Sequence, residues 1–101
     1  MKHEADKAKL ERLLAESPPT EGMYVRRRGE NLTIGRQEPF GPGGALVDDD
    51  RLRLTALGAS TWGLSVRRHT GRWEKTPFTG TLHELNAIIQ TLMQHLVAPY
   101  A

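Results

Sequence analysis

The chain has 101 residues, of which 38% are hydrophobic and 26% charged, with a formal net charge of +2 and no cysteine. This length and composition predict one domain, residues 1–101, with an ordinary hydrophobic core. The absence of cysteine excludes disulfides, thiol nucleophiles, iron–sulfur clusters and zinc sites that contain cysteine. The N-terminus has no apolar signal-peptide region and no stretch reaches membrane-spanning length, so we expect a soluble, cytoplasmic protein without membrane contact.

Residues 3–16 are predicted to form an amphipathic helix. Leu10, Leu13 and Leu14 recur at helical spacing, and charged residues occupy most of the remaining positions. The sequence Ser17-Pro18-Pro19 ends the helix, because proline lacks an N–H and disfavours helical geometry in the residue before it.

Between residues 22 and 76 the hydrophobic period changes from 3.6 to 2, which indicates β-strands. Glycine and proline predict a loop over residues 38–44, and three consecutive aspartates, 48–50, are interpreted as a solvated loop before a strand. Short turns between the strands favour an antiparallel meander. The expected strands are 23–28, 32–34, 51–57, 61–68 and 72–76, with 45–47 as a possible sixth.

The strongest predicted helix begins at Thr81 and continues to about Val97. Thr81 and Glu84 form a capping-box pattern, and Pro99 follows the expected end. Two helices with one apolar stripe each, and strands with one apolar face each, predict a two-layer α+β sandwich. In this arrangement both helices cover one face of a five- or six-stranded antiparallel sheet, and the other face stays open. The apolar stripe of the second helix contains Leu82, Leu85, Ile88, Ile89, Leu92, Met93 and Leu96.

No enzyme motif is complete. The segment 58–62 has tryptophan where a nucleophile elbow needs glycine, and the glycine-rich segment 40–44 lacks the Lys-Ser/Thr of a P-loop. The four histidines show no ligand spacing, and three consecutive aspartates of an extended segment cannot converge on one cation. We therefore expect no enzyme, no catalytic residues, no cofactor and no metal site.

Strand alternation collects basic residues on the open sheet face. If Leu52 and Leu54 face the helices, the arginines beside them face outward, and the same argument applies to the strands at 23–28 and 61–68. A flat basic face with an aromatic side chain is typical of proteins that bind single-stranded nucleic acid. The alternative is that the arginines only cover the sheet with their stems and remain hydrated. The predicted nucleic-acid or anion site contains Arg26, Arg28, Arg51, Arg53, Arg67 and Tyr24, with Thr55, Gly63 and Ser65 between them.

The C-terminal helix presents a second candidate surface. After Glu84 the chain has no Asp, Glu, Lys or Arg, and depletion of charge is typical of the centre of a protein interface. The hypothesis is a protein partner or a homodimer on this surface. The alternative is that the sheet and the first helix bury the whole apolar stripe and that amide side chains coat the rest. The predicted interface residues are Asn86, Gln90, Gln94 and His95.

Two short blocks resemble the frataxin family. Gly35-Arg-Gln-Glu-Pro39 is similar to that family's Asn-Lys/Arg-Gln-x-Pro segment, with glycine in place of asparagine. Gly71-Arg-Trp73, followed by Gly80-Thr-Leu-His-Glu-Leu85, is similar to the family's last strand and the start of its C-terminal helix. The resemblance implies a helix, antiparallel sheet, helix architecture.

Frataxins bind iron along an acidic ridge on the first helix and first strand, and this ridge is not matched. Lys7, Lys9 and Arg12 interrupt the acids of the helix, and positions 26–28 of the strand are all arginine. The family's Gln-Ile-Trp segment is replaced by residues 40–44, so no metal residue is carried over. We expect a non-catalytic binding or interaction protein of frataxin-like architecture. The second hypothesis is a single-stranded nucleic-acid-binding module, and the third is an iron-handling protein.

Overall fold

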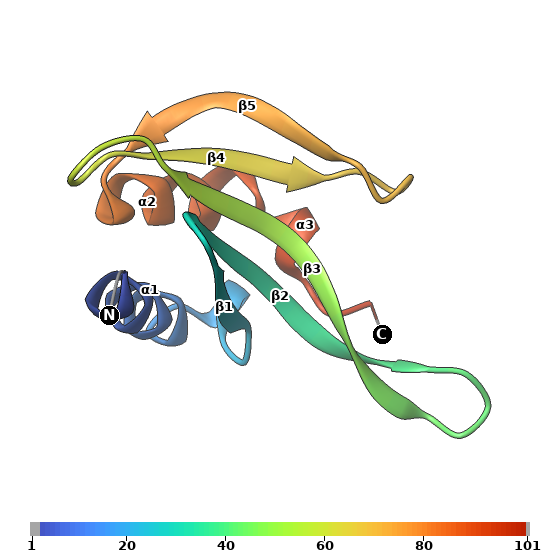
Figure 1. Ribbon diagram of the computed structural model, residues 1–101. Helices are drawn as coiled ribbons and strands as arrows, with labels where there is room; N and C mark the ends of the chain where they lie inside the picture. The colour runs from blue at the N-terminus through green and yellow to red at the C-terminus, as the bar shows by residue number, and fades with distance from the viewer. Residues whose placement is uncertain (1–2, 101) are drawn as a thin grey trace.

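The computed structural model describes residues 3–100. Its five strands form one antiparallel sheet in the order β1-β2-β3-β4-β5 (Figure 1). The expected α+β meander is confirmed, although the segment 45–47 belongs to β3 and makes no sixth strand. The elements are α1 (Glu4–Ala15), the 3-10 turn η1 (Pro18–Thr20), β1 (Tyr24–Arg28), β2 (Asn31–Phe40), β3 (Ala45–Ala56), β4 (Trp62–Arg67), β5 (Trp73–Gly80), α2 (Leu82–Leu92) and α3 (Gln94–Val97).

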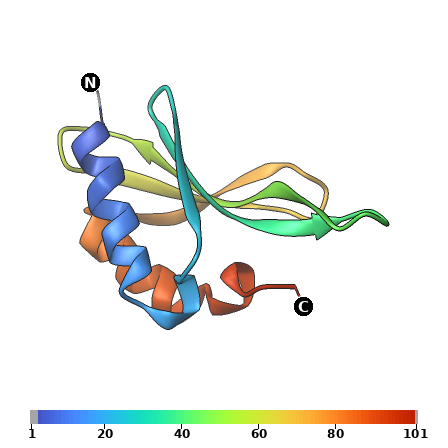
Figure 2. The same cartoon turned by 90° about the horizontal axis from the view of Figure 1, so that it is seen from below.

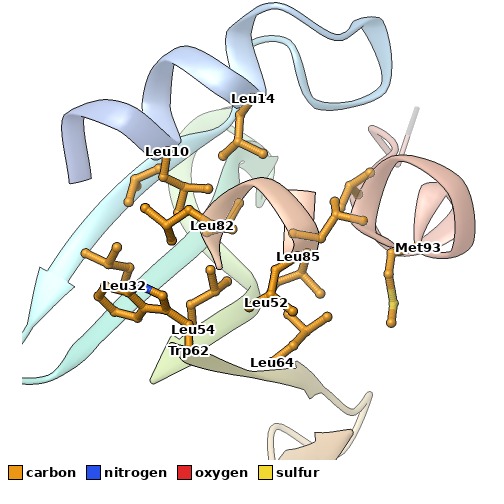
Figure 3. Packing of buried hydrophobic residues seen from close by; sticks show 14 residues of the cluster. Leu10, Leu14, Leu32, Leu52, Leu54, Trp62, Leu64, Leu82, Leu85 and Met93 are labelled. Atoms are coloured by element: carbon orange, nitrogen blue, oxygen red, sulfur yellow. The ribbon is translucent and has the colours of Figure 1, made fainter. Parts of the chain in front are cut away.

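The core lies between one face of the sheet and the two longer helices. The register places Val25 opposite Ile34 and Ile34 opposite Leu52, so these buried side chains share one face. Leu10 of α1 and Leu85 of α2 belong to the same buried cluster (Figure 3). Figures 1 and 2 both show α1 and α2 on this side of the sheet, and no helix of residues 3–100 covers the other side.

β2 and β3 continue beyond their neighbours as a two-stranded arm, residues 36–49. β1 pairs with β2 only as far as Gly35, and β4 pairs with β3 only from Leu52 onward. The predicted loop over residues 38–44 is therefore wrong in its first half, since β2 runs to Phe40 and only residues 41–44 form the turn. Positive φ values of 75° and 66° at Gly41 and Gly44 allow the chain to reverse within these four residues. The arm projects away from the helices (Figure 1).

A β-bulge in β3 changes the orientation of one predicted site residue. Ile34 pairs with Leu52, but the next residue, Gly35, pairs with Asp50, so Arg51 is an extra residue without a partner in β2. The bulge turns Arg51 to the helix-covered face, where its side chain is only 6% exposed. The prediction that Arg51 lies on the open face is wrong for this reason. The aspartates at 48–50 also lie within β3 and are not a loop.

Arg51 and Arg36 together hold the C-terminal segment. Arg51 donates through Nη1 to the carbonyl oxygens of Leu96 and Ala98, at 3.1 and 2.9 Å. Arg36 donates through Nε to the carbonyl of Val97 at 2.6 Å, and its Nη atoms reach two carbonyls around η1. The carbonyls of residues 96–98 have no partner within the last turn of α3, so the two guanidinium groups cap the end of this helix.

The C-terminal helix is not continuous to Val97, contrary to expectation. At Met93 the backbone leaves helical geometry, with ψ near 16°, and α3 begins at the next residue. The break lets both Met93 and Val97 remain buried in the core, while it leaves Leu92 56% exposed. The capping box at the start of α2 is confirmed, since the Thr81 hydroxyl accepts from the Glu84 N–H and the Glu84 carboxylate accepts from the Thr81 N–H.

Candidate functional site

A line of five residues, three of them basic, crosses the open sheet face at right angles to the strands. Each member lies directly opposite the next in the strand pairing, so all five share one face. Basic residues alternate with small hydroxyl residues, which places neighbouring cations two strand spacings, or roughly 10 Å, apart. The order across the sheet is Arg26, Thr33, Arg53, Ser65 and Lys75, and we call the three basic members the cationic row.

The cationic row is only partly neutralised. Arg26 lies 3.4 Å from Asp48, and because both side chains are well exposed this pair is weak and screened by salt. Within residues 3–100, Arg53 and Lys75 make no salt bridge. The Nε of Arg53 is buried and has no acceptor among the described atoms. The middle and one end of the row are thus cations without a carboxylate partner.

Trp73 of β5 lies on the same face beside the row. It pairs with Arg67 of β4, and the guanidinium of Arg53 lies 4.7 Å from the centre of the indole ring, with that of Arg67 at 5.9 Å. Both distances are typical of cation–π contacts. These contacts hold two planar guanidinium groups over an aromatic ring, which together form a surface suited to stacking planar groups.

Tyr24 occupies the other side of the face, above Gly35. Its hydroxyl donates to Asp50, and the guanidinium of Arg26 lies 4.5 Å from the ring centre. Burial, followed by the hydrogen bond to Asp50, raises the pKa of Tyr24 above its ordinary value, so the phenol stays protonated. A Cβ at position 35 would overlap the Tyr24 ring and the carbonyl of Asp49. The ring can therefore occupy this place only because residue 35 is glycine.

Most of the predicted basic site is brought together on the open face. Arg26, Arg28, Arg53, Arg67 and Tyr24 lie there, and so do the small residues Thr55, Gly63 and Ser65, whereas Arg51 does not. The sequence prediction missed Trp73 and Lys75. Their alternation within 72–76 shows that they share a face, but only pairing with β4 decides which face that is.

Two carboxylates that were not expected also reach the open face. Asp48 contacts Arg26 and Gln37, and Asp50 contacts Tyr24 and lies 3.7 Å from Arg67. Both lie toward the arm. The opposite margin of the cationic row, around Arg28, Thr55 and Thr79, carries no carboxylate among the described strand residues. The carboxylates contributed by the strands thus lie on the arm side of the row, whereas Glu30 of the β1–β2 turn, beside the other margin, lies 2.9 Å from His3.

The predicted partner surface on the C-terminal helices is less uniform than the sequence indicated. Gln90 is half-buried and donates to the Thr20 hydroxyl at 2.8 Å and to Asn86 at 3.1 Å, so it joins α2 to η1. Gln94 and His95 are exposed but belong to α3, beyond the break. The two halves of the proposed interface thus lie on separate helices, and the interface stays a prediction.

The structure and the comparisons with known proteins name no activity. Among residues 3–100, no three His, Asp or Glu side chains come together in a way that could hold a metal ion. No helix in this part of the chain combines the length and apolarity needed to cross a membrane. No family model, no curated protein and no solved structure matches the chain. The frataxin resemblance therefore rests on its two sequence blocks alone.

Proposed function

We propose that this is a non-catalytic binding protein whose open sheet face binds single-stranded nucleic acid. The observation that supports this most directly is the position of Arg53, which lies at the centre of the cationic row, without a carboxylate partner, over the ring of Trp73. A single strand offers phosphates and exposed aromatic bases, and this face offers cations and aromatic rings side by side.

The small residues of the row make the face accessible to a polymer. Thr33 and Ser65 lie between the cations, so a backbone can approach the sheet closely and place phosphates near Arg26, Arg53 and Lys75. Arginine also presents a flat surface on which a base can stack. Asp48 and Asp50 repel phosphate on the arm side, which directs the strand along the row and its acid-free margin.

The test is a titration of a fluorescently labelled single-stranded oligonucleotide, followed by anisotropy at several salt concentrations. About four phosphate contacts predict a slope of log K against log salt of roughly −3. The double variant Arg53→Glu with Lys75→Glu reverses two charges of the row and should abolish binding. Neither side chain makes a salt bridge among residues 3–100, so the variant breaks no ion pair and should retain the fold, which circular dichroism checks.

The matched control is Arg12→Glu with Lys9→Glu, which makes the same change of charge on α1, on the other side of the sheet. This variant should bind almost as tightly as the wild type. Equal loss of affinity in the two double variants would mean that net charge, and not the face, attracts the strand. Undetectable binding by the wild type at low salt would refute the proposal.

A second candidate function is self-association through the arm. Phe40 and Leu46 near its end are 73% and 61% exposed, and no strand in the described part of the chain pairs with the outer edge of either arm strand. Two arms could pair antiparallel about a two-fold axis. Sedimentation equilibrium of the wild type and of Leu46→Ser tests this: a dimer that the variant weakens supports it, and a monomer at tens of micromolar removes it.

A further inference from the structure

The open face contains a hollow of about 170 Å³ on the acid-free margin of the cationic row. It lies over β3, β4 and β5, and no carboxylate contributes to its walls. Its main lining residues are Thr55, Leu57, Gly63, Ser65, Lys75 and Thr79.

A second β-bulge and a glycine make this hollow. Gly63 pairs with Thr79 and Ser65 with Lys75, so three residues of β5 lie opposite one residue of β4, and the strands separate locally. Gly63 forms the floor because it has no side chain to fill the space. Leu57 forms one wall close to Gly63 and is 59% exposed.

We infer that the hollow receives one unstacked base of the bound strand while the adjoining phosphate contacts Lys75. The inference rests on the proposed function and specifies how that site contacts a base of the bound strand. Lys75 and Ser65 belong both to the hollow and to the line of residues that crosses the sheet, so a phosphate on the row places its own base within reach of the hollow.

The chemistry of the walls fits a base better than it fits a second phosphate. Leu57 supplies an apolar surface against which one face of a ring can pack. The Thr79 hydroxyl has no hydrogen-bond partner among the described residues, so it can donate to or accept from a base edge. The Thr55 hydroxyl already donates to Asn31 at 2.6 Å and retains only its acceptor capacity. A duplex does not offer an unstacked base, so the hollow selects single strands.

The experiment compares a labelled oligonucleotide with an abasic strand of the same length and charge. The wild type should bind the strand with bases about five- to one-hundredfold more tightly, which is the range expected for stacking of one base. Gly63→Val fills the hollow and should remove the part of this preference that one base in the hollow supplies, while bases that stack on Arg53 and Trp73 keep the rest. Affinity for the abasic strand should not change.

The fold should tolerate this substitution. Gly63 lies in a strand without positive φ, valine favours strands, and the three atoms nearest to an added Cβ belong to the exposed side chain of Leu57. Gly43→Val is the matched control, because Gly43 lies in the arm turn with nothing within 4 Å and without positive φ. If Gly63→Val fails to fold, Leu57→Ala, which alters an exposed side chain, tests the same wall.

The outcomes separate the two proposals. Equal binding of both strands by the wild type, or an undiminished preference for bases in Gly63→Val and Leu57→Ala, overturns the base pocket and leaves the cationic row intact. A clear reduction of the preference in Gly63→Val, with the full preference retained in Gly43→Val, supports the pocket. If neither strand binds to the wild type, the proposed function fails and the pocket fails with it.

Discussion

The two faces of the sheet use arginine in opposite ways. On the helix-covered face, Arg51 is buried and uses its donors on two carbonyls and on the carboxylates of Asp49 and Glu38. On the open face, Arg53 has no carboxylate partner among residues 3–100, and one of its buried N–H groups has no acceptor there. Only two positions separate these residues in the same strand. Partners and burial therefore decide which arginine stabilises the fold and which is available to a ligand.

The buried arginines are part of a clamp on the C-terminal segment. Arg51 stacks on Tyr100 at 4.0 Å, and the Tyr100 hydroxyl donates to Asp49 at 2.6 Å. Arg36 is held by backbone carbonyls alone, and burial, together with the nearby Arg51 charge, lowers its pKa below the ordinary value. Three carbonyls around the end of α3 are thus bonded to guanidinium groups. Open-face cations have no comparable role in the fold.

The largest expected difference between the faces is in stability. Arg51→Met should lower the free energy of unfolding by roughly 3–5 kcal/mol, because it leaves two carboxylates and two carbonyls without their shared donor. Arg53→Met should change it by less than about 1 kcal/mol, since no ion pair is lost. Urea denaturation of both variants measures the contrast. Similar losses in the two would contradict the division of roles between the faces.

A smaller effect on stability is expected at Gly35, beside the bulge in β3. Gly35→Ala would push a Cβ into the Tyr24 ring and the Asp49 carbonyl, and the backbone cannot yield without shifting β3. We expect a loss of about 1–3 kcal/mol, as for overpacking in a core. Gly43→Ala, which meets nothing, should stay within about 1 kcal/mol of the wild type. Thermal unfolding compares them, and equal midpoints would show that the close packing over Gly35 is not needed.

The smallest expected effect is on a single titration. Burial acts to raise the pKa of Asp49, but hydrogen bonds from Tyr100 and Arg51 outweigh it, so the folded pKa lies below the ordinary 3.8. Because the folded pKa is depressed, the stability that Asp49 contributes is present above pH 3.8 and is lost as the pH falls through the folded pKa. Tyr100→Phe should raise the pKa of Asp49, as followed by carboxyl NMR.

Tyr24→Phe is the matched control for that titration. It removes the same kind of phenol–carboxylate hydrogen bond on the open face, at Asp50, and should leave the Asp49 titration almost unchanged. An unaltered Asp49 pKa in Tyr100→Phe would show that the C-terminal segment does not hold this carboxylate in solution.

Patterns that depend on neighbours in the chain were predictable from the sequence. The alternation of Leu52 and Leu54 identified their buried face, the capping box located the start of α2, and the order of elements indicated a meander. Most of the basic face followed, because alternation assigns Arg53 and Arg67 relative to buried residues of their own strands.

Tertiary pairing decided the rest. Arg51 lies on the helix-covered face because β3 has one more residue than β2 between two paired positions. The sequence of β3 alone does not indicate this extra residue. Trp73 and Lys75 joined the face through their pairing with β4, and α2 ended at Met93 although no glycine or proline stands there. The hollow beside Gly63 likewise requires three residues of β5 to oppose one of β4. Alternation specifies which residues of one strand share a side, whereas bulges and register depend on contacts between segments far apart in the chain.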